Sequence, residues 1–172
     1  NGGATDGRYL YYGAWMDGTG FPERIIGNGR VLRYDTTGEN ASFSLRYSDL
    51  GHNGGLCAAL PGTRFLVNTD RGVVSVASNK RPLEDRHHLV GVYDGQSISL
   101  YINGQLVNAQ VAGGKIVNNG TDVTLGGLLG GSAAFQGQIE ELRISSSARD
   151  AGWIRTQYIN QSDPTSFCRI AP

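Results

Sequence analysis

One segment, HHLVGVYDGQSISLYINGQLV (residues 87–107), constrains the fold of this chain more than any other. Apolar and polar side chains alternate along it with a period of two, as they do in half-buried β-strands. The pairs Asp94-Gly95 and Asn103-Gly104 interrupt the alternation, and both pairs are typical of tight hairpin turns. The segment therefore predicts a three-stranded antiparallel meander.

The rest of the chain also shows the sequence patterns of short β-strands and tight turns. Glycine makes up 26 of the 172 residues, about twice its usual share, and it stands between short runs rich in β-formers. The same patterns predict further strands over residues 8–16, 23–27, 30–35, 41–47, 56–60, 64–68, 73–77, 123–125 and 135–145.

A single helix is predicted near the C-terminus, over residues 151–160. Asp150 is suited to cap its first turn, and Asp163-Pro164 ends it. Trp153 and Tyr158 fall on one apolar stripe that would pack against a sheet. Many short strands and one late helix predict an all-β fold, an antiparallel two-sheet jelly-roll sandwich with one short C-terminal helix.

Length and charge narrow the class of protein. A chain of 172 residues suits one domain over 1–172, with a flexible Gly-rich lead-in at 1–7 and a C-terminal tail at 161–172. Lys and Arg total 15, and so do Asp and Glu, so the net charge is zero, which argues against a nucleic-acid partner. No apolar run reaches the roughly 18 residues of a membrane span.

Three stretches in order carry a family resemblance. They are RHHLVGVYDGQSISLYINGQLV (86–107), DVTLGG (122–127) and FQGQIEELRISSSARDAGWIRTQYINQSDPTSF (135–167). Together they resemble the concanavalin A-like, laminin-G-like jelly-roll domains of secreted and surface-bound bacterial proteins. The resemblance implies two curved antiparallel sheets, a non-catalytic recognition or adhesion role, a secreted or cell-surface location and, in some members, a bound calcium ion.

The chain departs from the family at its start. The family opens with an extra strand before the first aromatic one, whereas only seven residues precede Arg8 here. That strand is absent, lies in the lead-in, or comes from another chain. An unpaired sheet edge invites strand addition, so self-association through such an edge is one expectation.

Two cysteines, Cys57 and Cys168, lie far apart and have no spacing typical of a metal site. In a secreted chain they would form one disulfide that ties the tail to the middle of the domain. In a cytosolic chain they would be two buried thiols.

Related jelly rolls include glucanases, which need two carboxylates on one strand face, about 5 to 5.5 Å apart for a retaining mechanism. No two acidic residues of this chain are separated by two positions, as neighbours on one strand face would be. A pair assembled from separate strands stays open, but the pattern favours a protein that is not an enzyme.

A glycan site needs aromatic platforms beside planar polar groups. The candidates are Tyr101, Tyr34 and Trp15, with Tyr101 expected to be the best exposed because it faces away from Leu100 and Ile102. The alternative is that most aromatic residues belong to the core or cover the sheets.

The sequence also offers candidate ligands for a calcium ion. Glu140 is expected to share a strand face with Leu142 and Ile144, which would bury its carboxylate near the core. Glu140, Asp35 and Glu39 are therefore candidate Ca²⁺ ligands. The alternative partner of Glu140 is a basic residue such as Arg143 or Arg33. Glu141 and Arg143 lie on the other strand face at i and i+2, and we expect them to form a surface pair of little energetic consequence.

The histidines are not expected to bind metal. His87 and His88 project to opposite faces of a strand, so one half-buried and one exposed ring are expected.

Three functions follow from these observations. The leading hypothesis is an extracellular recognition module that binds a glycan or a protein partner as part of a larger surface protein. The second is a structural subunit of a filament or pilus-like assembly, and the third, which the carboxylate spacing disfavours, is a polysaccharide hydrolase.

Overall fold

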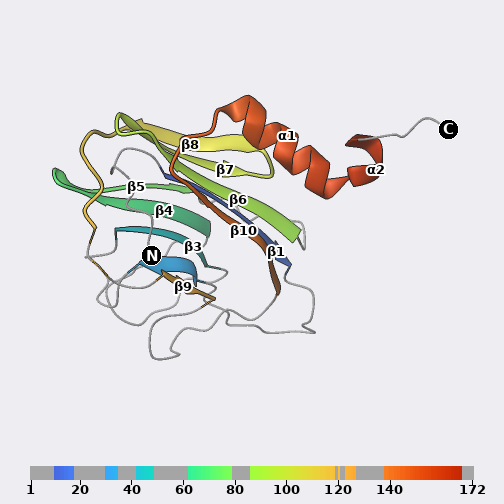
Figure 1. Cartoon of the computed structure of the whole chain (residues 1–172), viewed down its shortest axis with the longest axis horizontal. Helices are drawn as coiled ribbons and strands as arrows, with labels where there is room; N and C mark the ends of the chain where they lie inside the picture. Colours follow the sequence, from blue (N-terminus) through green and yellow to red (C-terminus); the bar gives the residue numbers. More distant parts are fainter. Residues whose placement is uncertain are drawn as a thin grey trace.

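Two antiparallel five-stranded sheets make up most of the structure (Figure 1). The structure, a computed structural model, describes residues 10–17, 30–34, 42–48, 62–78, 86–118, 120, 123–126 and 138–167. Sheet A has the strand order β10 (Gln138–Ser145), β1 (Leu10–Asp17), β6 (Arg86–Tyr93), β7 (Ser97–Ile102), β8 (Gln105–Val111). Sheet B has the order β5 (Gly72–Ser78), β4 (Gly62–Thr69), β3 (Phe43–Ser48), β2 (Arg30–Tyr34), β9 (Val123–Leu125).

The predicted sandwich is confirmed, and so is its central meander. Strands β6, β7 and β8 pair in succession, and Asn103 and Gly104 make the second turn with positive φ angles of 51° and 73°. Both angles belong to a type I′ turn, which matches the twist of the flanking strands. The strands predicted over 23–27 and 56–60 lie outside the described residues.

The main core fills the space between the two sheets. Its buried members come from β3, β4 and β5 on one side and from β6 and β7 on the other. The sheets approach closely at Gly91 of β6, where a methyl group would overlap the ring of Phe65 in β4. This close approach explains why the alternating row of β6 has a glycine in its middle.

β10 contains a β-bulge. Its pairing with β1 shifts by one residue in mid-strand, and Glu141 has a φ of 56°. A bulge interrupts the strict alternation of faces along a strand. The prediction that Glu140 shares a buried face with Leu142 and Ile144 is therefore wrong, and the Glu140 side chain is 45% exposed.

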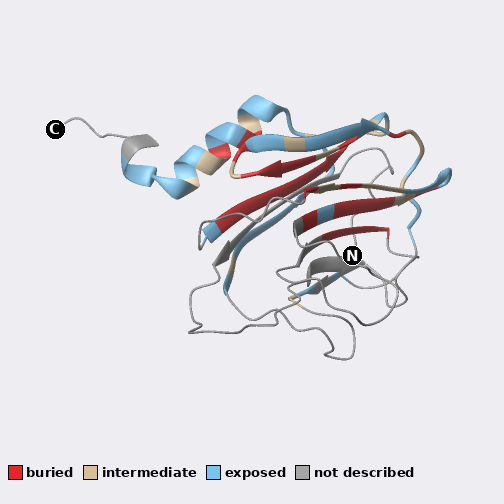
Figure 2. Ribbon diagram, turned by 180° about the vertical axis from the view of Figure 1, so that it is seen from behind, coloured by how far each residue is buried: buried red, intermediate tan, exposed pale blue. Residues whose placement is uncertain are grey.

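Helix α1 (Ala151–Ser162) covers the outer face of sheet A over β6, β7 and β8 (Figure 1). Val90, Val92 and Tyr101 of the sheet form a second apolar cluster with Ile154 of the helix, and Trp153 packs against it. Figure 2 shows α1 exposed along most of its length, with buried residues where it meets the sheet. The predicted helix is thus confirmed.

A second, four-residue helix, α2 (Pro164–Phe167), was not expected. It begins at the proline that ends α1, after Asp163, whose backbone N–H caps the carbonyl of Ile159. No helix within the described residues is both long and apolar enough to cross a membrane.

Candidate functional site

A groove of about 640 Å³ lies between helix α1 and the turn that joins β7 to β8. Gln105 and Leu106 line one wall, Arg155 and Ile159 line the other, and Tyr101 lies at its base. Its volume falls in the range of about 300 to 1,000 Å³ that is usual for small-molecule sites. We call this feature the helix groove.

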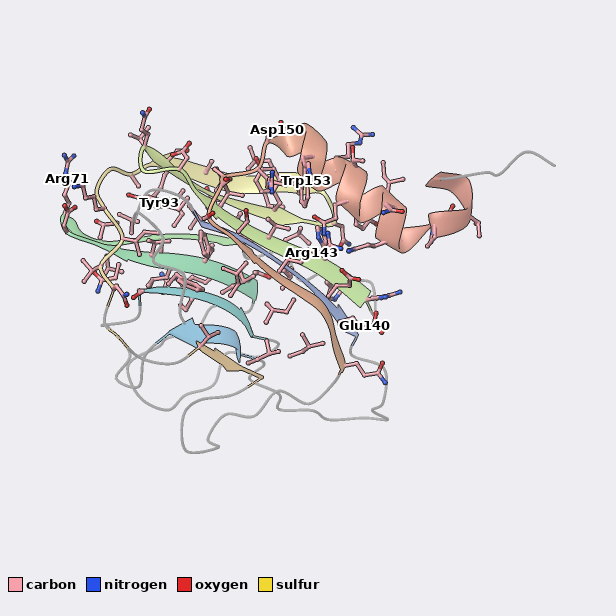
Figure 3. All side chains as sticks on the ribbon, viewed as in Figure 1. Arg71, Tyr93, Glu140, Arg143, Asp150 and Trp153 are labelled. Carbon is pink, nitrogen blue, oxygen red and sulfur yellow. The ribbon has the colours of Figure 1, made fainter. Side chains whose placement is uncertain are left out.

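The position of α1 beside the groove follows from its first turn. The Asp150 carboxylate accepts a hydrogen bond from the backbone N–H of Trp153 at 2.7 Å, as an N-cap should. Figure 3 shows Asp150 at the start of α1 and Trp153 directed toward the sheet.

The turn between β7 and β8 fits closely against the helix. A Cβ atom at Gly104 would lie 3.0 Å from Cβ of Tyr158, so only glycine lets the turn approach the helix this closely. The side-chain Oδ1 of Asn103 accepts a hydrogen bond from the backbone N–H of His88 at 2.9 Å, which ties the turn to β6. The groove therefore has a rigid wall.

Tyr101 is less accessible than predicted. Its side chain does face away from the inter-sheet core, but it is only 8% exposed because α1 covers that face. Burial raises the pKa of Tyr101, and the nearby Asp150 carboxylate raises it further. The expectation of an exposed platform at Tyr101 is thus wrong, although the residue still contributes to the base of the groove.

The His88 ring packs near the ring of Tyr158. Their ring centroids lie 6.1 Å apart, and the His88 side chain is 1% exposed. Burial, with a smaller contribution from the Arg143 charge, lowers the pKa of His88 to about 4. His87 is also buried, so the expectation of one exposed histidine ring is wrong.

The groove combines apolar surfaces with planar polar groups. Leu106 is 55% exposed and Ile159 is 37% exposed, and the Tyr158 side chain is half-buried. Gln105 and Arg155 are exposed and carry an amide and a guanidinium group. Such a surface can bury the C–H face of a sugar ring and donate hydrogen bonds to its hydroxyl groups.

Sequence reasoning missed Gln105, Arg155 and the role of Tyr158. The turn pair Asn103-Gly104 and the helix were each predicted, but nothing in the sequence showed that they would meet. Only the docking of α1 over β7 and β8 brings these residues together.

The predicted ligand residues belong to two different sheets. Trp15 lies in β1 of sheet A, where it pairs with His88 and Glu140, whereas Tyr34 ends β2 of sheet B and pairs with Val123. Tyr101 and Tyr34 therefore belong to different sheets.

Of the three predicted calcium ligands, the structure describes only Glu140. Glu140 forms an exposed ion pair with Arg86 of β6, rather than with Arg143 or Arg33 as the alternative had it. Asp35 and Glu39 lie outside the described residues, as do Cys57 and Cys168. Within the part of the chain that the structure describes, no three His, Cys, Asp or Glu residues gather at a possible metal site. Calcium binding stays a prediction.

The neighbouring surface pair was predicted correctly. Arg143 donates to the Glu141 carboxylate at 2.7 Å, and the side-chain amide of Gln161 in α1 donates to the same carboxylate at 3.2 Å. Figure 3 places Arg143 beside the helix, so this pair links the edge strand β10 to α1.

The comparisons with known proteins agree with this fold. The family described as the concanavalin A-like lectin/glucanases superfamily matches residues 12–155. The comparison with curated protein sequences gives no match.

Three solved structures illustrate the likeness. A candidate carbohydrate-binding protein from Bacteroides ovatus superposes with a TM-score of 0.64 at 19% identity, over 87% of this chain and 40% of that one. The CBM40 of the Ruminococcus gnavus IT-sialidase, bound to α2,3-sialyllactose, gives 0.63 at 17% identity, over 88% and 83%. A SAP-like pentraxin from Limulus polyphemus gives 0.60 at 14% identity, over 88% and 70%. At these identities the likeness is one of fold.

Proposed function

The chain belongs to the concanavalin A-like lectin/glucanases superfamily, and from this premise we propose that it is a non-catalytic glycan-binding module of an extracellular protein. The observation that carries the proposal is the helix groove, with Tyr158, Gln105 and Arg155 around one sugar-sized volume. Two of the structural neighbours are described as binding carbohydrate or as bound to a sialylated sugar, which supports the ligand class.

The geometry suits recognition of a short glycan. A sugar ring offers an apolar C–H face that can lie against Tyr158 and Leu106, which removes apolar surface from water. The guanidinium of Arg155 and the amide of Gln105 can each donate to adjacent hydroxyl groups. Because both side chains project from regular secondary structure, binding needs little ordering of the backbone, and the ordering cost is that of the two long side chains.

The proposal excludes hydrolysis as the role of this groove. Among the described residues that line it there is no Asp or Glu. Asp150, which precedes the lining residue Ala151, is engaged as the helix cap. Glycoside hydrolysis by the usual route requires two carboxyl groups that flank the scissile bond. The module would therefore hold a glycan without cleaving it, and purified protein should release no reducing sugar from β-glucans.

Our first prediction tests the helix groove. Arg155→Ala and Gln105→Ala should each weaken glycan binding about tenfold, because each removes a hydrogen bond worth about 1.4 kcal/mol. A glycan array identifies the ligand, and calorimetry then measures the affinity of each variant. Both residues are exposed, so thermal unfolding should be unchanged.

The matched control is Arg71→Ala, which removes the same charge at the tip of the β4–β5 hairpin, far from α1 in Figure 3. Affinity equal to that of the unmodified protein is expected for this variant. Absence of saturable binding to any glycan would contradict the proposal and point to a protein partner or an assembly role. Binding unaffected by both groove variants would contradict the placement of the site.

A further inference from the structure

The helix groove contains one charged group. Among the described residues that line it, Arg155 is charged and all the others are neutral. The Arg155 side chain is exposed, and within the described part of the chain it forms no ion pair and no side-chain hydrogen bond. The lining of the groove is therefore positively charged, and the guanidinium group that carries the charge is available to a ligand.

The place of Arg155 in α1 sets it along one wall of the groove. Ala151, Arg155 and Ile159 are four residues apart, so they form one ridge of the helix, and all three line the groove. The side chains of Ala151 and Ile159 have no acceptor that would occupy the guanidinium. On the opposite wall the exposed Gln105 amide has no hydrogen-bond partner among the described residues. A ligand in the groove thus meets hydrogen-bond donors from both walls.

The carboxylates near α1 do not neutralise Arg155. Asp150 lies five residues before it, about 7.5 Å along the helix axis, and its carboxylate caps the first turn. Asp163 lies eight residues after it, about 12 Å along the axis, at the other end of the helix. Glu141 of β10 is paired with Arg143. Each of these acidic groups has a place of its own, and none forms an ion pair with Arg155.

Such a groove favours an anionic ligand over a neutral one. A guanidinium group is planar and binds a carboxylate through two parallel N–H hydrogen bonds, which are stronger than hydrogen bonds between neutral groups. We propose that the helix groove binds a glycan that carries a carboxylate, such as a uronic or sialic acid, and that Arg155 determines this selectivity. The proposal rests on the glycan-binding function proposed above.

A single guanidinium suits a carboxylate better than a phosphate. A carboxylate carries one negative charge, whereas a phosphate monoester carries about 1.5 to 2 at pH 7. Sites for phosphorylated groups commonly use clusters of arginines. Arg155 is the one cation among the described lining residues, so it balances one carboxylate. The carboxylate should lie toward Arg155 rather than toward Tyr101 at the base, because the Asp150 charge acts on Tyr101.

Our second prediction compares acidic glycans with neutral forms of the same sugars. The array should contain 3′-sialyllactose, oligogalacturonides and oligoglucuronides beside the methyl ester of each. The tightest ligand should be a free acid, and calorimetry should show that it binds about tenfold more tightly than its own ester. The ester keeps the hydroxyl groups of the sugar and removes its charge. The ratio of the two affinities therefore measures the contribution of the carboxylate.

Three variants locate that contribution. Arg155→Gln should reduce the ratio to about one, because glutamine keeps an amide donor but has no charge. Gln105→Ala should weaken binding of acid and ester alike by about tenfold and leave the ratio unchanged. Arg71→Gln, far from α1 in Figure 3, is the matched control and should change neither affinity. All three residues are exposed, so thermal unfolding should show that each variant is folded.

The outcomes separate this inference from the proposed function. Equal affinity for acid and ester, or tightest binding of a neutral glycan, would overturn the carboxylate selectivity while leaving glycan binding intact. A ratio unaffected by Arg155→Gln would overturn the role of Arg155. Tighter Arg155-dependent binding of a sulfated or phosphorylated sugar would overturn the assignment to a carboxylate. Absence of saturable binding to any sugar would contradict the proposed function itself, and this inference with it.

Discussion

His88 shows how one buried side chain can make the stability of the fold depend on pH. The His88 ring is buried beside Tyr158 of α1. The positive charge of Arg143 in β10 acts on it, and Glu141 is paired with that arginine. The pKa of His88 is lowered from 6.5 to about 4, mainly by burial. The folded protein therefore keeps this histidine neutral in a range where the unfolded chain would protonate it.

Our third prediction concerns this histidine. Between pH 6.5 and about 4 the unfolded state binds more protons at this position than the folded state, so stability is full above pH 6.5 and falls as the pH is lowered. The loss should level off near pH 4 at about 3 kcal/mol, since one pKa unit corresponds to about 1.4 kcal/mol. Urea unfolding at several pH values measures it.

The control is His88→Gln, which has no group that titrates in this range. This variant should be less stable at pH 7 because of lost packing, yet the difference in its stability between pH 7 and pH 4.5 should be smaller by about 2.4 kcal/mol, most of the full effect. A variant with the full pH dependence of the unmodified protein would show that other groups cause the effect.

At individual residues, the sequence predicted a local ion pair correctly, but it did not predict which side chains are covered by other elements. The Glu141–Arg143 pair follows from two positions on one strand, and it was predicted correctly. Tyr101 and Glu140 were placed wrongly for two different reasons. Tyr101 is covered by a helix from a distant part of the chain, and Glu140 is turned by a bulge that alternation does not reveal. Both causes are tertiary, and neither has a local sequence signal.

Helix α1 is the element on which the proposed glycan site depends. It forms one wall of the helix groove and covers the outer face of sheet A. Only Ile154 and Gln157 of the helix are buried, so its contact with the sheet is narrow. Interactions within the helix itself, such as its N-terminal cap, should therefore affect how the helix lies on the sheet.

Our fourth prediction concerns the cap of α1. Asp150→Ala removes the acceptor for the backbone N–H of Trp153 and should lower the free energy of unfolding by about 1 kcal/mol. Fraying of the first turn should also weaken glycan binding at the helix groove, because Ala151 and Gly152 line it. Denaturant unfolding and calorimetry measure the two effects.

Asp150→Ser is the matched control, since serine also caps helices. It should retain most of the stability and the affinity. If serine and alanine had equal effects, the contribution of Asp150 would be its charge rather than its hydrogen bond.

Elements were more predictable than their arrangement. The meander over β6, β7 and β8 was predicted because its pairs are adjacent in sequence and joined by turn residues with a clear conformational role. The helix was predicted from its cap and its apolar stripe, although it runs two residues farther, to Ser162. The neighbours of β1, namely β6 and β10, could not be predicted, because those pairings join parts of the chain that lie far apart in sequence.

In the whole molecule, the outer face of sheet A carries α1 and the helix groove. The edge strand β10 of sheet A combines a bulge with Glu140, Glu141 and Arg143, and both features oppose the addition of another strand. Self-association through a sheet edge stays a prediction, and β10 is an unfavourable place for it.

Our fifth prediction concerns Cys57 and Cys168, the only cysteines in the chain. If the protein is extracellular, as we propose, an oxidising environment favours one disulfide between them. Closing so long a loop restricts the unfolded chain and should contribute about 4 kcal/mol to stability.

Mass spectrometry without reductant should find no free thiol. The Cys57→Ser, Cys168→Ser double variant should unfold at a lower denaturant concentration, and reductant should not change that midpoint. Two free thiols in native protein purified from an oxidising compartment would contradict the pairing, and with it one argument for an extracellular location.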